Sequence, residues 1–239
     1  MSDEVGSRLD RLAEQFALPP QTPATLERLL ALIAADPRAP TAIRDAVAAV
    51  DEHIADALVA LELDAVATAR RIADLGSGAG FPGLVLAVAL PEARISLVES
   101  NQRKCEFLER AVGQMKLDNA CVVPERAEAW TEGVRRCDLV TARALAPLNV
   151  LVEYAAPLLR PQGALVAWKG HRDATEEADG AAAAAATGLE PVAVHSVRPW
   201  PEAHNRHLHL YLKVGLTPNE YPRRPGIATK RPLRASTLA

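Results

Sequence analysis

Apolar residues recur at helical spacing in two segments near the start of the chain. The first segment, TPATLERLLALIAAD (22–36), carries an apolar stripe, and we expect Thr22 to cap this helix and Pro23 to begin it. The second segment, AIRDAVAAVDEHIADALVAL (42–61), repeats the pattern. Residues 1–66 are therefore predicted to form an N-terminal helical extension.

From residue 71 onward, short apolar runs alternate with longer segments of helical periodicity. Such runs are typical of buried strands, and the longer segments of helices. The expected strands are 71–75, 93–100, 120–125, 137–143, 163–170, 190–197 and 206–214. The expected helices are 82–90, 101–117, 146–159 and 176–189. This alternation predicts an α/β fold with a mostly parallel sheet, and the last two strands, which no helix separates, predict an antiparallel strand at its end.

The segment 217–239 differs from the rest, because it is rich in proline and has no acidic residue after position 220. Its basic residues are Arg223, Arg224, Lys230, Arg231 and Arg234. Two interpretations stay open: a solvated chain terminus, or an arm that contacts phosphates. We therefore divide the chain into the helical extension, an α/β domain over 67–216 and this basic tail.

Composition excludes several classes of protein. The net charge of −3 predicts no general attraction for nucleic acid, so an RNA partner would need a local basic patch. Cys105, Cys121 and Cys137 are odd in number and form no C-x-x-C, which argues against a disulfide framework or a zinc knuckle. The N-terminus lacks the apolar region of a signal peptide, and the run GLVLAVAL is too short to span a bilayer. We expect a cytoplasmic protein with no membrane partner.

The motif ADLGSGAGFPG (73–83) lies between an expected strand and an expected helix. Backbone N–H groups and the helix N-terminus face a bound ligand at such a position. Its glycines allow positive φ angles and a close approach of the backbone. Glu99 ends the next strand, where a carboxylate can accept hydrogen bonds from both ribose hydroxyls of an adenosine. Together they indicate a cofactor that contains adenosine.

Asp74 decides between two cofactor classes. The motif fits G-x-G-x-x-G, typical of dinucleotides, and also D-x-G-x-G-x-G. An anion at Asp74 would repel a pyrophosphate, whereas it suits the ammonium and sulfonium groups of S-adenosylmethionine, directly or through water. S-adenosylmethionine, which becomes S-adenosylhomocysteine when it loses its methyl group, is therefore favoured over a nicotinamide.

Two missing motifs limit the chemical groups that could accept the methyl group. No Asn-Pro-Pro-Tyr-like segment follows the fourth strand, where the sequence reads TARALAPLN, and such a segment would be expected for an exocyclic amine. No Pro-Cys offers a nucleophile for pyrimidine C5. An acceptor with its own lone pair, such as guanine N7, fits these absences, because it needs only positioning and desolvation.

Five segments resemble the glucose-inhibited division protein B family, whose members are bacterial methyltransferases acting on guanine N7 of 16S ribosomal RNA. The segments are DLGSGAGFPGLVLAVALPEARISLVES, ERAEAW, VTARALAPLNVLVEYAAPLL, GALVAWKG and YPRRPGIATKRPL. The resemblance runs from about residue 41 to 234. It implies a class I, Rossmann-like methyltransferase fold with a seven-stranded sheet, and 16S ribosomal RNA, free or within the small ribosomal subunit, as the partner of an expected monomer.

The resemblance also implies residue roles. For the cofactor it implies a loop formed by Gly76, Gly78, Gly80 and Phe81, a ribose contact at Glu99, and an adenine-side contact at Ala127 and Glu128. Arg143 of TARA matches an arginine at both the cofactor and the active site, while Arg126 and Lys169 match basic positions suited to the guanosine or its phosphates. Structural alternatives are an Arg143–Glu128 ion pair, an exposed strand end at Lys169 and core packing by Phe81.

The N-terminal part departs from the family pattern. Where the family usually has Asn-Leu-Thr and His-Ile-x-Asp-Ser, this chain has APTAI and HIADA, so only Thr41, His53 and Asp56 match. We expect His53 to be a partly buried helix histidine rather than a catalyst. The segment HNRHLH has no carboxylate or cysteine nearby in sequence, so we expect no metal site there.

The hypothesis with the most support is a 16S ribosomal RNA guanine-N7 methyltransferase. A small-molecule methyltransferase would share the cofactor site, but the basic tail argues against it. A nicotinamide oxidoreductase conflicts with Asp74. A non-enzymatic RNA-binding module would leave the glycine loop and Glu99 without a role.

Overall fold

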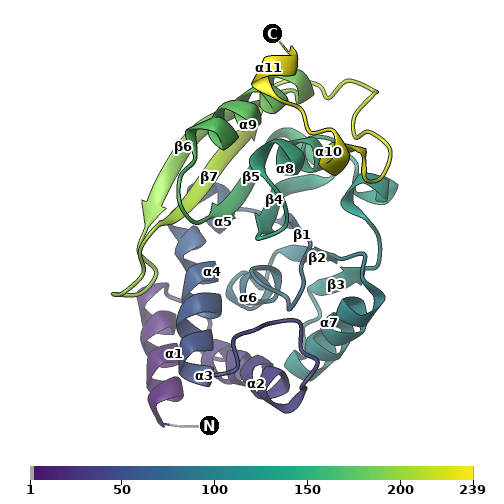
Figure 1. Cartoon of the computed structure of the whole chain (residues 1–239). Coiled ribbons are helices and arrows are strands. Elements are labelled where there is room, and N and C mark those ends of the chain that lie inside the picture. Colours follow the sequence, from purple (N-terminus) through teal and green to yellow (C-terminus); the bar gives the residue numbers. More distant parts are fainter. Residues whose placement is uncertain (1–2, 239) are drawn as a thin grey trace.

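The computed structural model describes residues 3–238, and its centre is a seven-stranded sheet in the order β3-β2-β1-β4-β5-β7-β6 (Figure 1). The strands are β1 (Arg71–Leu75), β2 (Arg94–Val98), β3 (Ala120–Val123), β4 (Cys137–Arg143), β5 (Leu159–Lys169), β6 (Leu189–Val197) and β7 (Arg206–Lys213). β1 to β5 pair in parallel, whereas β7 runs antiparallel to both β5 and β6. The predicted mostly parallel sheet with an antiparallel strand is confirmed.

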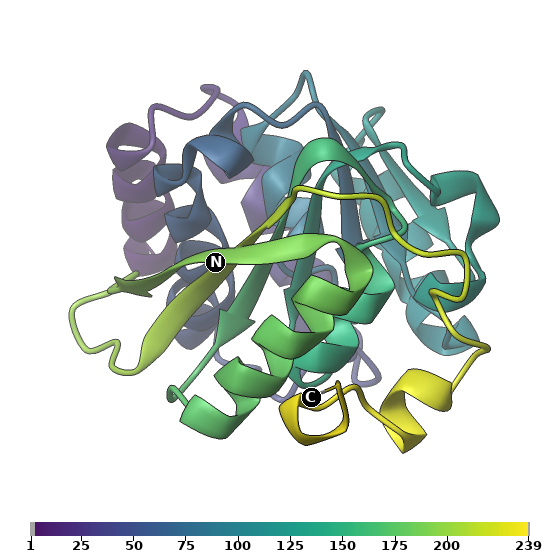
Figure 2. The same ribbon diagram turned by 90° about the horizontal axis from the view of Figure 1, so that it is seen from above.

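Helices cover both faces of the sheet, as the view from above shows (Figure 2). One face carries α1 (Asp3–Gln15), α2 (Thr22–Ala35), α3 (Ala46–Ala49), α4 (Asp56–Leu58), α5 (Asp64–Ala67), α6 (Gly83–Ala89) and α7 (Gln102–Met115). The other carries α8 (Leu148–Ala155), α9 (Ala174–Thr187), α10 (Ile227–Lys230) and α11 (Ala235–Leu238). Three short 3₁₀ turns connect some of these elements: η2 (Val59–Glu62), η3 (Ala127–Ala129) and η4 (Thr131–Gly133).

Strand alternation divides the core between these two layers. On β1, Ile72 faces the cluster that includes the N-terminal helices, and Ala73 and Leu75 face the cluster around α8 and α9. Residues of α1 and α2 belong to the same cluster as α6 and α7. The N-terminal helices therefore share one core with this face of the sheet.

The helix that begins at Ala46 contains one wider turn. Asp45 caps it, since its carboxylate accepts a hydrogen bond from the backbone N–H of Ala48 at 2.8 Å. A π-helical turn, η1 (Val50–Ala55), then interrupts the α-helix before α4. Such turns occur often at functional sites, and this one contains His53 and ends immediately before Asp56.

Several boundary predictions were wrong, among them the start of α2 and the end of the helix before β5. Thr22 does not cap α2 but is its first residue, after Gln21, and the buried Thr22 hydroxyl has no hydrogen-bond partner among the described residues. The helix expected over 146–159 ends at Ala155, because the chain turns at 156–158 and then joins β5, which starts at Leu159 rather than at 163.

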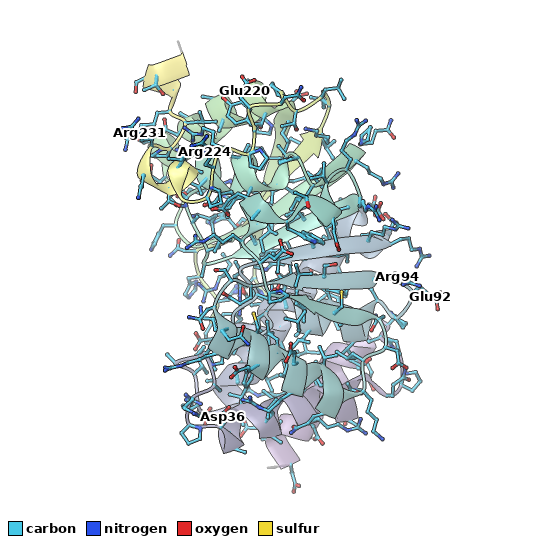
Figure 3. The ribbon with its side chains drawn as sticks, turned by 90° about the vertical axis from the view of Figure 1, so that its right-hand side faces the viewer. Asp36, Glu92, Arg94, Glu220, Arg224 and Arg231 are labelled. Atoms are coloured by element: carbon cyan, nitrogen blue, oxygen red, sulfur yellow. The ribbon has the colours of Figure 1, made fainter. Side chains whose placement is uncertain are left out.

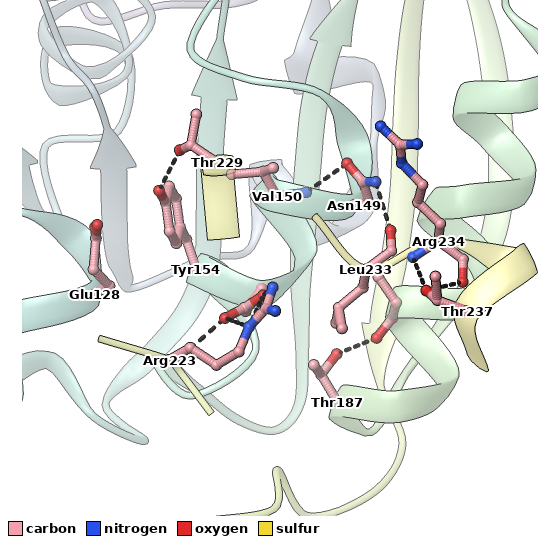
Figure 4. Close-up of polar contacts among 12 residues, drawn as sticks. Glu128, Asn149, Val150, Tyr154, Thr187, Arg223, Thr229, Leu233, Arg234 and Thr237 are labelled. Carbon is pink, nitrogen blue, oxygen red and sulfur yellow. Dashed lines mark hydrogen bonds and ion pairs between the residues drawn. The ribbon is translucent and has the colours of Figure 1, made fainter. Parts of the chain in front are cut away.

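The basic tail is held against α8 by side-chain contacts (Figure 4). The buried carboxylate of Glu153 accepts hydrogen bonds from the backbone and guanidinium of Arg223, the shortest at 2.6 Å. Asn149 donates to the carbonyl of Leu233 at 2.6 Å, and the hydroxyls of Tyr154 and Thr229 lie 3.2 Å apart. The interpretation as a solvated terminus is therefore wrong for this part of the tail.

The other basic side chains of the tail are exposed, among them Arg224 and Arg231, which are labelled in Figure 3. The phosphate-contacting arm thus stays a prediction. Within residues 3–238, no helix has the length and apolar character needed to cross a membrane.

Candidate active site

The glycine loop joins β1 to α6 with three positive φ angles. Gly76, Gly78 and Gly80 have φ of 65°, 57° and 94°, a region that other residues adopt with strain. Space is also limited, because a Cβ on Gly80 would lie 2.2 Å from Cδ1 of Leu84. The loop conformation therefore depends on glycine at these positions.

Asp74 lies beneath this loop with no exposed surface. Its Oδ1 accepts a hydrogen bond from Thr141, its neighbour on β4, at 2.9 Å, and its Oδ2 accepts one from the backbone N–H of Gly83 at 3.2 Å. Burial raises the pKa of the Asp74 carboxyl to about 6 despite these bonds. Its two oxygens fasten the loop and α6 to the sheet, and an interaction of Asp74 with a cofactor's cations, directly or through water, stays a prediction.

A first cleft of about 380 Å³ opens above the loop, at the carboxyl ends of β1, β2 and β4. Glu99 lines it with a carboxylate that accepts hydrogen bonds from the backbone N–H groups of Gly78 (3.2 Å) and Asn101 (2.8 Å). Each carboxylate oxygen has a second lone pair and can accept a further bond. The structure therefore places Glu99 beside the glycine loop, as predicted from the spacing.

Opposite Glu99, the first cleft is lined by Arg126, Ala127 and Glu128, the last two in η3. The Glu128 carboxylate accepts a hydrogen bond from the backbone N–H of Gly226 in the tail at 3.0 Å. Arg126 is largely exposed and lies 3.9 Å from Glu128. Thr229 of the tail also lines this cleft, so the tail forms part of its wall.

A second cleft of about 370 Å³ lies on the other side of the segment that follows β4. Ala144, which has a φ of 54°, lines both clefts. Arg143, Lys169, His53, Asp56, Trp168 and Arg206 line the second. They come from the N-terminal helix and from the ends of β4, β5 and β7, where open α/β sheets bind their ligands.

Arg143 ties the sheet to the N-terminal helix at this cleft. Its guanidinium donates to Asp56 Oδ2 at 2.9 Å, to the carbonyl of Glu52 at 3.0 Å and to His53 Nδ1 at 3.1 Å. It also lies 5.4 Å from the centre of the Phe81 ring. The alternative of an Arg143–Glu128 ion pair is wrong, because these partners hold Arg143 in the second cleft.

His53 is stacked on Phe81, with ring centroids 4.3 Å apart. Arginine can only donate, so Nδ1 of His53 is an acceptor and Nε2–H donates to the hydroxyl of Thr41 at 2.8 Å. Burial and the Arg143 charge lower the pKa of His53 to about 4. The imidazole is therefore neutral near pH 7 and has no free nitrogen, which agrees with a helix histidine that positions its neighbours.

Two predicted substrate residues lie in different places. Lys169 lines the second cleft and pairs with Glu176 at 2.6 Å, whereas Arg126 lies at the first. The described residues hold no cluster of three metal-ligating side chains, and His207 interacts with the carbonyl of Gly170.

Sequence reasoning assigned no role to Asp56, Trp168 or Arg206. Only the His-Ile-x-Asp pattern pointed to the first of them. The other two are distant along the chain, and only the pairing of β5 with β7 brings them to the cleft.

Comparison with solved structures places the fold among methyltransferases. A predicted O-methyltransferase from Agrobacterium tumefaciens has a TM-score of 0.51 at 25% identity, covering 68% of this chain and 80% of that one. The fibrillarin pre-rRNA processing protein of Methanococcus jannaschii has a TM-score of 0.53 at 16% identity, covering 67% and 74%, and shows likeness of fold alone.

Sequence comparison identifies the family. A family model described as rRNA small subunit methyltransferase G (GidB) matches residues 31–208. A ribosomal RNA small subunit methyltransferase G from Rubrobacter xylanophilus is 41% identical over 189 residues, covering 77% of this chain and 72% of that protein. The protein of the same name from Chloroflexus aggregans is 39% identical, covering 81% and 82%. This chain belongs to the rRNA small subunit methyltransferase G family.

Proposed function

We propose that this protein transfers a methyl group from S-adenosylmethionine to N7 of a guanine in 16S ribosomal RNA, in the cytoplasm. The observation that carries the proposal is the pair of clefts that meet at Ala144, one beside the glycine loop and one beside Arg143. Two ligands bound in these clefts would approach each other at the end of β4. Membership of the family supports the choice of ribosomal RNA as acceptor.

The first cleft fits S-adenosylmethionine by its charge. Its acidic side chains are Glu99, Glu125 and Glu128, and its basic ones are Lys104 and Arg126. This balance suits ribose hydroxyls and an ammonium group better than a pyrophosphate, which would need an excess of donors. We propose that Glu99 binds the ribose and that Ala127 and Glu128 lie beside the adenine. Gly76, Gly78 and Gly80 would let the cofactor come close to the backbone of the loop.

The second cleft would hold the guanosine. When bound, the cofactor supplies a methyl group whose bond to sulfur breaks as the N7 lone pair forms the new bond, leaving S-adenosylhomocysteine and a cationic guanine. No proton has to be removed from N7, and this agrees with the neutral His53, whose two nitrogens are both occupied. The residues would therefore act by position: Arg143 and Lys169 bind the nucleotide, Trp168 excludes water, and the buried Phe81 supports His53 and Arg143 from behind.

Methyl transfer with defined RNA tests the proposal. Purified protein is incubated with labelled S-adenosylmethionine and either 16S RNA, 23S RNA or assembled small subunits, and the RNA is digested to nucleosides. We expect label in 7-methylguanosine from 16S RNA or from the small subunit alone. Label in another nucleoside, or in none, would refute the proposed acceptor, and labelling of the assembled subunit alone would identify it as the substrate.

A further inference from the structure

Two charged groups in the second cleft face each other without a hydrogen bond. Asp56 Oδ1 and Arg206 Nε lie 3.6 Å apart, beyond the usual range of an N–H···O bond. Both atoms are buried, and neither has a hydrogen-bond partner among residues 3–238. Unsatisfied buried polar groups are uncommon in native structures, so a bound ligand is expected to supply the missing hydrogen bonds of this pair.

Hydrogen bonds hold Asp56 in place, and an aromatic ring supports Arg206. The other oxygen of Asp56 is bound by Arg143, and its main-chain carbonyl accepts a hydrogen bond from the Trp168 indole at 2.8 Å. The Arg206 guanidinium lies 5.2 Å from the centre of the Trp200 ring on the hairpin between β6 and β7. The cleft therefore presents one acceptor and one donor side by side, each supported by other contacts.

We infer that Asp56 and Arg206 recognise the acceptor guanine by its O6 and N1–H groups. This inference rests on the proposed function and names the residues that select the base. Guanine presents an acceptor, O6, next to a donor, N1–H, and the Arg206 donor and Asp56 acceptor match this order. Adenine presents a donor followed by an acceptor, so both contacts would become repulsive.

The recognised edge leaves the methyl acceptor free. On the guanine ring, O6 lies between N1 and N7, so a pair that binds O6 and N1–H does not cover N7. The base would enter between the two side chains and supply each with the hydrogen bond that it lacks. Arg206, whose side chain is 35% exposed at the start of β7, is the group that moves to admit it.

Base replacement in the RNA tests this inference. The guanine methylated by the wild-type enzyme is mapped and then replaced by adenine or by inosine, and kcat/KM is measured for each RNA. We expect wild type to prefer guanine over adenine by about 100-fold or more, and Asp56→Asn to reduce this ratio at least about tenfold, because an amide can both donate and accept. The lower nucleophilicity of adenine N7 is common to both enzymes and cancels from the comparison.

Arg206→Gln provides a second variant, for which we expect the same loss of base preference even if Asp56→Asn folds poorly. Arg198→Gln removes the same charge from the same hairpin outside the cleft, so its ratio is expected to equal that of wild type. Inosine keeps O6 and N1–H, so we expect it to be methylated within about threefold of guanine.

Three results separate the outcomes. If both cleft variants lower kcat/KM for guanine and adenine by the same factor, the pair has a structural role only and the inference is wrong. If inosine is as poor an acceptor as adenine, the enzyme recognises the 2-amino group instead, and the inference is wrong again. If wild type methylates no guanine at all, the proposed function fails rather than this inference.

Discussion

The guanidinium of Arg143 donates a hydrogen bond to Nδ1 of His53 at 3.1 Å, and this contact disfavours a proton on that nitrogen. A proton on Nδ1 would face a permanent positive charge within hydrogen-bond distance. Burial, which is the larger cause, and the charge of Arg143 together keep the imidazole neutral and lower its pKa from 6.5 to about 4. His53 therefore acts as a fixed, uncharged contact between the N-terminal helix and Arg143 at the end of β4.

The depressed pKa of His53 predicts a dependence of stability on pH. The unfolded chain binds a proton near pH 6.5 and the folded one only near 4, so stability is lost as pH falls through this window. Between pH 7 and pH 5 the loss from this group is about 2 kcal/mol. We expect His53→Gln to lack this component in urea unfolding at pH 5, 6 and 7.

Asp74 provides an internal check on that experiment. Its raised pKa gives the opposite slope, because the folded state binds the proton more tightly between pH 3.8 and about 6. This contribution is present in wild type and in His53→Gln, so it cancels from their difference. A difference in unfolding free energy that does not change with pH would contradict the assignment of a neutral His53.

The buried Glu153–Arg223 pair predicts how the tail is attached. Glu153→Gln leaves Arg223 without its counter-charge, and we expect a loss of about 2–4 kcal/mol in unfolding free energy, together with faster trypsin cleavage after Arg223 and Lys230. Glu177→Gln removes a similar two-point contact, to Arg172, on the exposed surface, and its effect is expected to be far smaller. Equal sensitivity of the two variants to trypsin would show that Glu153 does not hold the tail.

Two glycine substitutions are expected to change stability in opposite directions. A Cβ on Gly83 would lie 2.4 Å from Leu97 Cδ2 and 2.7 Å from Asp74 Oδ2, so Gly83→Ala should destabilise the protein by about 1–3 kcal/mol. Gly113 lies in α7 with no other atom within 4 Å of an added Cβ, so Gly113→Ala should stabilise it by about 0.5–1 kcal/mol. Thermal unfolding followed by circular dichroism measures both, and a neutral Gly83→Ala would contradict the close packing of the loop.

The separation of the two clefts predicts separate effects on the two ligands. Glu99→Gln should weaken S-adenosylhomocysteine binding about tenfold or more in calorimetry, because a charged acceptor of ribose hydroxyls is lost. Lys169→Gln should leave that affinity unchanged and raise KM for RNA. Weakening of the cofactor affinity by the same factor in both variants would contradict the assignment of the clefts.

Arg126 is now expected to behave differently from Lys169. The resemblance grouped the two as substrate residues, but Arg126 lies at the mouth of the first cleft beside Glu128. We therefore expect Arg126→Gln to change cofactor affinity as well as RNA binding. An unchanged affinity for S-adenosylhomocysteine, measured by calorimetry, would instead support Arg126 as a substrate residue like Lys169.

Local patterns in the sequence determined the elements and the first cleft. Helical spacing, strand alternation and the turn after β1 depend on contacts between residues close along the chain, and so do the positions of Gly76 and Gly80. Glu99 was found in the same way, because the carboxyl ends of adjacent parallel strands lie at one edge of the sheet. The structural role of Asp74 was not found in this way, because only the tertiary structure shows that its buried carboxylate binds Gly83 and Thr141.

The tertiary structure alone decided the second cleft and the place of the tail. Asp56, Arg143 and Arg206 come from a helix and two strands, and no spacing along the chain relates them. Their charges meet because the N-terminal helix packs beside β4 and β5, and because β7 returns antiparallel next to β5. Likewise, the sequence around Glu153 indicates only a helix, and its partner Arg223 is known from the tertiary structure alone. Interactions between distant segments leave no periodic signal, since each segment satisfies its own local pattern whatever its later partner.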